Sequence, residues 1–307
     1  MGCTRRGVYV WLIGGVLPLM AGLGAGAEVT VKSGRVQVEV RDAGGAVVAE
    51  VQAGGGPATL NVDREYKPGD RIIVTGPPSM VVRLDAAMPE CAVFSPAGRI
   101  EFPITKTADP DPKRPGKVYP PEAFAGPKHV VTARPATADE PAAYRNVAAN
   151  PYDLRGPTTF FPHATSNSEC RNEPVFAARN AIDGRIGNKG HGGWPNQSWG
   201  PEQRKDLWWK VDLGRPVAVD KVVIYIRADF PHDKVWHDAV LKFSDGTAEK
   251  IRIEKTAEPQ TFKFSVRTVS SVEIADLVQD EPLGWAALTE VEVWGRDAGA
   301  AKAEAKP

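Results

Sequence analysis

The second half of the chain is a series of short apolar runs that have the two-residue period of β-strands and no helical period. In the run 221–227, Val222, Ile224 and Ile226 share one face, and the residues between them share the other. Strands are predicted at 207–213, 221–227, 239–243, 250–253, 261–264, 271–274 and 288–294. So many short strands predict an all-β domain, a β-sandwich or jelly roll, over residues 158–296.

The N-terminus has the pattern of a secretory signal peptide. The basic pair Arg5-Arg6 opens an apolar run over residues 8–23, and Ala25-Gly26-Ala27 ends it with a cleavage-site pattern. The run is short for a membrane-spanning helix and is broken by glycine and proline, although a retained anchor is the alternative. We predict that residues 1–27 are removed and that the mature chain, from Glu28, is secreted, periplasmic or attached to the cell surface.

The charge balance argues against two classes of partner. The whole chain has 38 basic and 38 acidic residues, and loss of Arg5 and Arg6 would leave 36 and 38. Nucleic acid and anionic lipid are usually held by a broad basic field, which this composition does not provide. We therefore predict no nucleic-acid partner, and no membrane partner after signal cleavage.

The rest of the chain divides by composition. Residues 28–104 alternate apolar and polar positions, as in Val36, Val38 and Val40, and glycine and proline interrupt them, which predicts a small β domain. Residues 105–157 are dense in proline and are predicted to be a connector, because proline removes ladder donors and disfavours helix. The tail, 297–307, is mostly Ala, Lys and Glu, a composition typical of disorder.

Two cysteines, Cys91 and Cys170, remain after signal cleavage. Export permits a disulfide between them, which would join the two predicted domains. Two buried free thiols are the alternative. The chain has no C-x-x-C motif, so the sequence supports neither a zinc ribbon nor a redox site.

Tryptophans concentrate in the C-terminal domain. Of the eight, all except Trp11 lie between Trp194 and Trp294. Tryptophan offers a large apolar face with a polar edge, which is suited to stacking on a sugar ring. The alternative is that most of them fill the core. We expect about four core tryptophans and about three that are exposed or carried on loops.

Four motifs follow one another in this domain. They are Ala164-Thr165-Ser166-Asn167-Ser168, Asn180-Ala181-Ile182-Asp183-Gly184, Trp208-Trp209-Lys210-Val211-Asp212-Leu213-Gly214 and Ala287-Leu288-Thr289-Glu290-Val291-Glu292-Val293-Trp294-Gly295. Together they resemble the discoidin, or coagulation factor 5/8 type C, family, whose bacterial carbohydrate-binding relatives are called family 32 modules. The resemblance covers residues from about 160 to 296. It implies an eight-stranded jelly roll of the galactose-binding-like type, and a fold that more often binds than cleaves.

The resemblance also implies a structural calcium near the turn that follows Ile182. Asp183 and Glu290 would supply carboxylates, and Asn180 and Arg185 would supply carbonyl oxygens. Calcium takes about six to eight oxygen ligands, and turns expose carbonyls. The chain departs from the family at this point, because a longer loop, 186–198, follows the turn and no threonine comes directly after it. The alternative is that Asp183 caps an Asx-type turn.

A ligand site is predicted on the loop that follows the strand 221–227, because jelly rolls carry binding residues on loops at strand ends. Arginine, aspartate and histidine side chains suit vicinal hydroxyls, and an aromatic ring gives a platform. The predicted shallow polyol site consists of Arg227, Asp229, Phe230, His232, Asp233 and Trp236, with His191 and Trp194 from the preceding loop. The alternative is a locked loop in which Asp233 caps a turn and Arg227 pairs with Asp229.

Two other kinds of chemistry are compatible with the same loops. His191, His232 and His237 would suit a transition metal, and their spacing neither supports nor excludes one. Paired carboxylates drawn from Asp183, Asp229 and Asp233 would suit glycoside hydrolysis, but nothing in the sequence shows that they face each other. The chain has no G-x-S-x-G, H-E-x-x-H or phosphate-loop motif.

The sequence therefore predicts an exported, non-catalytic carbohydrate-binding protein whose partner is a glycan or polysaccharide. Two alternatives come from other functional classes. One is a small glycosidase or lyase that uses paired carboxylates. The other is a structural cell-surface protein whose discoidin-like domain binds protein.

Overall fold

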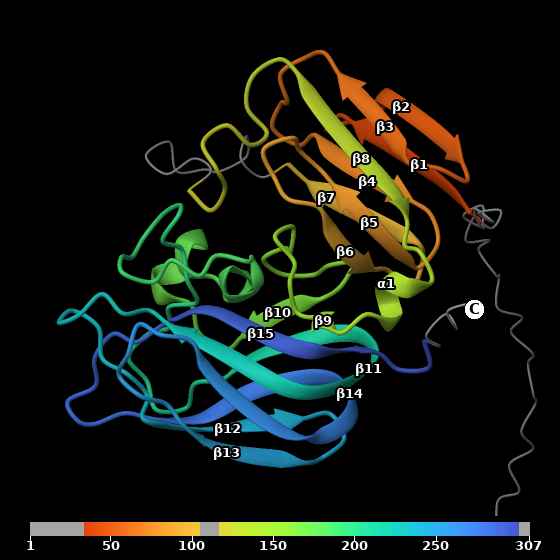
Figure 1. The fold of residues 1–307 in the computed structure, drawn as a ribbon. Helices are drawn as coiled ribbons and strands as arrows, with labels where there is room; N and C mark the ends of the chain where they lie inside the picture. The colour runs from red at the N-terminus through yellow and green to blue at the C-terminus, as the bar shows by residue number, and fades with distance from the viewer. Residues whose placement is uncertain (1–33, 105–116, 301–307) are drawn as a thin grey trace, which may run out of the picture. The chain divides into compact units, whose positions relative to one another are not determined.

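The computed structural model describes residues 34–104 and 117–300, most of whose regular structure is antiparallel β-strand (Figure 1). The predicted signal peptide, the first residues of the predicted small β domain, part of the predicted connector and the end of the predicted tail lie outside the described residues. In the described residues, the structure has no helix that is both long and apolar enough to span a membrane.

The N-terminal part is a sandwich of two four-stranded antiparallel sheets. One sheet has the order β2-β1-β4-β7, with β1 (Arg35–Arg41), β2 (Val47–Gly54), β4 (Arg71–Thr75) and β7 (Arg99–Pro103). The other has the order β3-β8-β5-β6, with β3 (Ala58–Val62), β5 (Ser79–Arg83), β6 (Cys91–Phe94) and β8 (His129–Pro135). Val38 and Ile72 from the first sheet share one buried cluster with Val82 and Val131 from the second. Burial of these apolar faces holds the sandwich together.

Part of the predicted connector belongs to these sheets. Strand β8 pairs with both β3 and β5, and its Val131 and Ala133 are buried. A short helix, α1 (Asp139–Ala142), follows, and then β9 (Arg145–Asn146), which pairs with β15. The high proline content of the segment hides the alternating pattern at 129–133. Pro127 precedes β8 and Pro135 is its last residue, so no proline lies in the interior of the strand.

The C-terminal part is a β-sandwich of jelly-roll type, as the sequence predicts. Its strands are β10 (His163–Ser166), β11 (Trp209–Ile226), β12 (Asp238–Phe243), β13 (Ala248–Arg252), β14 (Gln260–Val278) and β15 (Leu288–Asp297). Their hydrogen-bonded order is β13-β12-β14-β11-β15-β9, and β10 pairs with β11. Three 3-10 turns, η2 (Cys170–Asn172), η3 (Pro174–Phe176) and η4 (Ala178–Ile182), lie between β10 and β11.

Two of the strands are each longer than predicted. Strand β11 spans the predicted strands at 207–213 and 221–227, and β14 spans those at 261–264 and 271–274. The ladder between β11 and β14 shifts register at two points, after Asp212 and after Val219. Such irregularities bend a strand without ending it, so four predicted strands become two bent ones.

The core of this sandwich confirms the predicted inner face. Val222, Ile224 and Ile226 are fully buried. Three tryptophans are also buried, and four are half-buried, which differs by one from the expected division. The buried ones are Trp199, Trp209 and Trp236, and the half-buried ones are Trp194, Trp208, Trp285 and Trp294.

The predicted disulfide is wrong, because Cys91 and Cys170 are both free and buried. The thiol of Cys91 lies 3.4 Å from the carbonyl oxygen of Ala149, and burial raises its pKa to about 12. Cys170 packs instead with Val175 and Phe176. The alternative of two buried free thiols describes both residues.

Candidate ligand-binding and metal-binding loops

Two loops at strand ends carry most of the predicted site residues. The first covers residues 183–198 after η4, and the second covers residues 227–237 between β11 and β12. Asn188 joins them, since its carbonyl oxygen accepts from the Ala228 N–H at 2.7 Å and its side chain donates to the carbonyl oxygens of Ile226 and Ala257 at 3.1 and 2.8 Å. Asn188 is buried, and the sequence gives no sign of this role.

The second loop is closed by an ion pair. The guanidinium of Arg227 donates to both carboxylate oxygens of Asp233, at 2.8 and 2.7 Å, and both side chains are buried. The Asp233 carboxylate also accepts from the Asp229 N–H at 3.2 Å, and the Asp233 N–H donates back to the Asp229 carbonyl at 3.0 Å. These contacts use up the polar atoms that a ligand would need. The structure therefore corrects the prediction that Arg227 and Asp233 face a ligand.

This arrangement is the locked loop given above as the alternative, with one change of partner. Asp233, and not Asp229, pairs with Arg227. Asp229, two positions after Arg227, is hydrogen-bonded to His191 instead. Asp233, six positions after Arg227, is brought back to the guanidinium by the turn. Asp233 is buried and salt-bridged, so it is also a poor candidate for a catalytic acid or nucleophile.

Trp236 does not provide a sugar platform. Its ring is buried and stacks on Trp199, with centroids 5.7 Å apart and an interplanar angle of 25°. A large apolar ring two residues before β12 gains more by joining the core than by facing water. The prediction that Trp236 contacts ligand is therefore wrong.

His191, Asp229 and His232 are brought together on the surface of the two loops. The imidazole rings are parallel within 7°, with centroids 4.8 Å apart. His191 Nδ1 is hydrogen-bonded to Asp229 Oδ2, which holds the pKa of Asp229 below its ordinary value. One potential ligand atom from each of the three residues lies within 4.8 Å of the others. His237 is not part of this group, because it pairs with Asp238 and Asp280.

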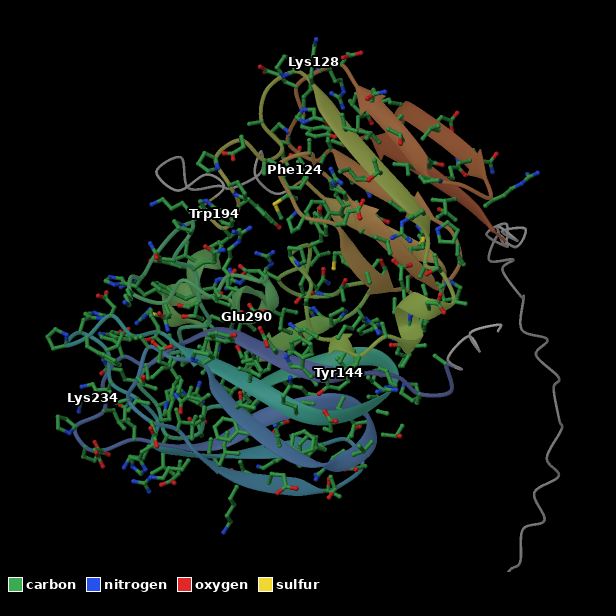
Figure 2. All side chains as sticks on the ribbon, in the orientation of Figure 1. Phe124, Lys128, Tyr144, Trp194, Lys234 and Glu290 are labelled. Atoms are coloured by element: carbon green, nitrogen blue, oxygen red, sulfur yellow. The ribbon has the colours of Figure 1, made fainter. Side chains whose placement is uncertain are left out.

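The two other predicted aromatic residues are half-buried. Phe230 packs against the core cluster, and the Lys255 ammonium lies 4.7 Å from the centre of its ring. Trp194 is carried on the first loop, with the Arg185 guanidinium 4.1 Å from the ring centroid (Figure 2). Each ring therefore has a cation against it, a contact worth about 0.5–1 kcal/mol at an exposed site.

Two buried carboxyl groups lie at the root of the first loop. Asp183 follows η4, and Glu290 belongs to β15 (Figure 2). The Asp183 carboxylate accepts from the Arg185 N–H at 3.0 Å and from Gln197 Nε2 at 2.7 Å. Glu290 Oε2 accepts from the Gly184 N–H at 3.1 Å. The bond to Arg185 is the predicted Asx-type turn, so Asp183 has both the turn role and a second contact.

Burial dominates the electrostatics of this acid pair. It raises the pKa of Asp183 to about 6, against the smaller lowering effect of the nearby Arg179. Burial also raises the pKa of Glu290 well above its ordinary value, and the charge of Asp183 raises it further. Two carboxyl groups that each disfavour the other's ionisation form a site that a cation would stabilise.

The oxygens around the acid pair fit a hard cation. Glu290 Oε1 and Gln197 Oε1 are buried and have no hydrogen-bond partner in the described residues, which is rare for buried polar atoms. The turn at Asp183 links the two side chains, since Gln197 Nε2 donates to the Asp183 carboxylate and the neighbouring Gly184 N–H donates to Glu290 Oε2. Carboxylate and amide oxygens are calcium ligands. Sequence reasoning missed Gln197, although it lies within the loop that departs from the family pattern.

The other two predicted calcium residues have their side chains committed elsewhere. The Asn180 side chain donates to the carbonyl oxygens of Pro174 and Ser198, at 2.9 and 3.3 Å. The Arg185 guanidinium lies over Trp194. Their predicted contribution is through backbone carbonyls, and it stays a prediction.

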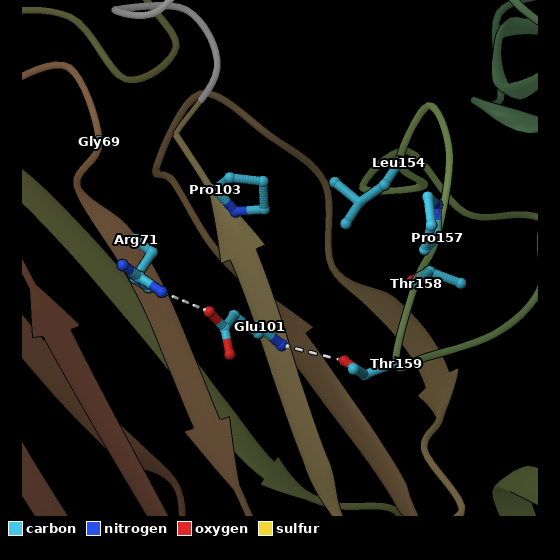
Figure 3. A pocket seen from close by; sticks show the side chains of 8 residues that line it. All are labelled: Gly69, Arg71, Glu101, Pro103, Leu154, Pro157, Thr158 and Thr159. Carbon is cyan, nitrogen blue, oxygen red and sulfur yellow. Dashed lines mark hydrogen bonds and ion pairs between the residues drawn. The ribbon is translucent and has the colours of Figure 1, made fainter. Parts of the chain in front are cut away.

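A separate pocket of about 440 Å³ lies beside the N-terminal sandwich (Figure 3). An ion pair between Arg71 and Glu101 at 2.8 Å crosses it, and the Glu101 N–H donates to Thr159 Oγ1 at 3.2 Å. The other lining residues are Gly69, Pro103, Leu154, Pro157 and Thr158. None of the site residues predicted from sequence lines this pocket.

Comparison with known families gives one match. Residues 161–294 match a family model described as "Domain of unknown function (DUF7402)". A search of curated proteins finds no match to the chain. The match covers less than half of the chain, and membership of the discoidin family stays a prediction.

Several solved structures resemble the chain weakly. Chitosan-binding module 1 of a chitosanase/glucanase from Paenibacillus sp. IK-5 is 22% identical, with a TM-score of 0.35, over 49% of this chain and 99% of that one. A fucose-binding module from Streptococcus pneumoniae is 17% identical, with a TM-score of 0.37, over 48% and 96%. The family 32 module of Clostridium perfringens NanJ, in complex with galactose, is 19% identical, with a TM-score of 0.34, over 43% and 91%. The fold described above rests on the strand order of this chain and not on these scores.

Proposed function

We propose that the chain is a non-catalytic carbohydrate-binding protein that binds a glycan through the exposed His191 and His232 and the half-buried Asp229 between them, with Phe230 as the next residue along the chain. The observation that carries the proposal is the convergence of two imidazoles and a carboxylate on one exposed surface. His191 Nδ1 is bonded to Asp229 and His232 Nδ1 to Asp233, so the two Nε2 atoms and the other oxygen of Asp229 are left to accept hydrogen bonds from adjacent sugar hydroxyls.

The buried residues of the same loops support this role. The Arg227–Asp233 pair and the side chain of Asn188 fix the backbone on both sides of the surface group. A fixed backbone lowers the conformational entropy that binding must overcome. The proposed group offers few polar contacts to a sugar, so we expect dissociation constants of about 10 µM to 1 mM.

We also propose that Asp183 and Glu290 hold a structural calcium ion. The support is the pair of buried, unpartnered oxygens, Glu290 Oε1 and Gln197 Oε1, next to two carboxyl groups that repel each other. A cation there would tie the turn after η4 to β15 and would fix the start of the first loop. In line with the predicted signal peptide, we propose that the protein acts outside the cytoplasm, where glycans and calcium are both accessible.

A glycan array followed by calorimetry tests the binding proposal. Galactose, fucose and chitosan oligosaccharides, which the similar solved structures suggest as probes, should be included. We expect at least one glycan to bind the calcium-loaded protein, and His232→Ala to weaken that binding at least tenfold. His237→Ala is the matched control, because His237 has acidic neighbours but lies outside the group. No binding on the array, or full binding by folded His232→Ala, would contradict the proposal.

A further inference from the structure

We infer that His191, Asp229 and His232 form a binding site for a divalent transition metal, with zinc as the reference ion. Each residue presents a ligand atom within 4.8 Å of the other two. The inference concerns the same surface as the proposed function but does not depend on it, because metal binding is measured without any sugar.

The ligand set selects the class of metal. Two imidazole nitrogens and one carboxylate oxygen suit zinc, nickel or copper, whereas calcium takes oxygen ligands alone. This site therefore differs in chemistry from the acid pair of Asp183 and Glu290. Both histidines are exposed, so a metal can reach their nitrogens without opening the core.

His232 is oriented by a buried carboxylate. Its Nδ1 lies 2.9 Å from Asp233 Oδ1, and Asp233 is held by two hydrogen bonds from Arg227. A carboxylate bound to arginine can only accept, so Nδ1 of His232 carries the proton and Nε2 keeps its lone pair. Histidines that bind a metal most often donate from their other ring nitrogen to a carboxylate or a carbonyl, as His232 does to Asp233.

The backbone around the three residues is already fixed. Asp229 and His232 lie on one turn, which the Asp233 N–H closes on the Asp229 carbonyl at 3.0 Å. His191 lies three residues after Asn188, which is hydrogen-bonded to the backbone of Ala228 and of Ile226. Ligands of a tetrahedral zinc ion are about 3.3 Å apart. The ligand atoms have at most 4.8 Å between them to close, and the side chains of both histidines are exposed.

The local charge also favours a cation. The charged groups that act on Asp229 are His191, His232 and Arg227, and Asp233 balances Arg227. With neutral imidazoles, the Asp229 carboxylate is left as the uncompensated charge. Three protein ligands leave at least one coordination position open, which water or a sugar hydroxyl would fill.

Calorimetric titration of the untagged, chelator-stripped chain with zinc chloride, in the absence of sugar, tests the inference. We expect one site per chain with a micromolar dissociation constant. His191→Ala and His232→Ala should each weaken binding at least tenfold, whereas His237→Ala should not change it. Circular dichroism confirms that each variant is folded.

Zinc binding weaker than millimolar, or zinc binding that survives in the folded double variant His191→Ala/His232→Ala, would overturn the inference. The two proposals can fail separately. If glycan binds and zinc does not, only the metal site is wrong. If zinc binds, and no glycan on the array binds either with or without zinc, only the proposed function is wrong.

Discussion

The two loops 183–198 and 227–237 contain polar residues of two kinds, one buried and one exposed. The buried kind includes Arg227 and Asp233, whose polar atoms are occupied by each other and by backbone N–H groups. The exposed kind includes His191 and His232, which keep ring nitrogens that face solvent. A buried charge must be paired, whereas an exposed polar group can stay open to solvent, so we expect residues a few positions apart to have separate roles. We expect burial, and not residue type, to separate the residues that hold the loops from those that bind a ligand.

The largest difference in stability between the buried and the exposed residues should come from Arg227→Ala. Removing the guanidinium leaves the Asp233 carboxylate buried without its partner, which costs about 3–5 kcal/mol of unfolding free energy. The exposed counterpart, His232→Ala, should cost less than about 1 kcal/mol. Urea denaturation of both variants measures the difference. Equal losses in the two variants would show that the division by burial is wrong.

The next effect concerns the acid pair. Calcium at 1,000 times its dissociation constant should raise the unfolding free energy of the wild type by about 4 kcal/mol. Glu290→Gln removes one of two buried carboxyl groups that repel each other. The variant should therefore be more stable than the wild type in chelator and should gain almost nothing from calcium. Thermal melts of both proteins with EGTA and with calcium measure this, and a calcium gain that persists in Glu290→Gln would argue against the site.

The acid pair should also give stability an unusual pH dependence. Burial raises the pKa of Asp183 from about 3.8 to about 6, and that of Glu290 is raised as well. The folded state therefore binds protons more tightly than the unfolded state, so calcium-free stability falls as the pH rises from about 4 through about 6. Asp183 alone should contribute about 3 kcal/mol of this loss, and Glu290 adds to it. Denaturation in EGTA between pH 4 and pH 8 measures this loss. Glu290→Gln is the control, and its unfolding free energy should depend less on pH.

Much of the fold could be predicted because alternating apolar positions require a buried face. Val222, Ile224 and Ile226 lie on the core side of β11 as predicted. Strand β8 was missed, because the proline content of 105–157 outweighed the short alternation at 129–133. The union of predicted strands into β11 and β14 was also missed, since local patterns do not show whether a bend ends a strand.

The candidate site was harder to predict, since spacing along the chain does not report burial. The sequence placed Arg227, Asp233 and Trp236 in the ligand site, and the structure buries all three. It also grouped His191 with His232, and the structure stacks their rings. Gln197 and Asn188 carry no recognisable motif, and their roles depend on contacts made across the fold.

The most direct test of the account is to map where a glycan binds. The ¹⁵N-labelled, deuterated protein is titrated with the strongest-binding sugar from the array, and amide chemical shifts are followed by NMR. The account predicts the largest shifts at His191, Asp229 and His232, and none at Arg71, Glu101 or Thr159, which line the pocket beside the N-terminal sandwich. Shifts confined to that pocket, with the two loops unchanged, would contradict it.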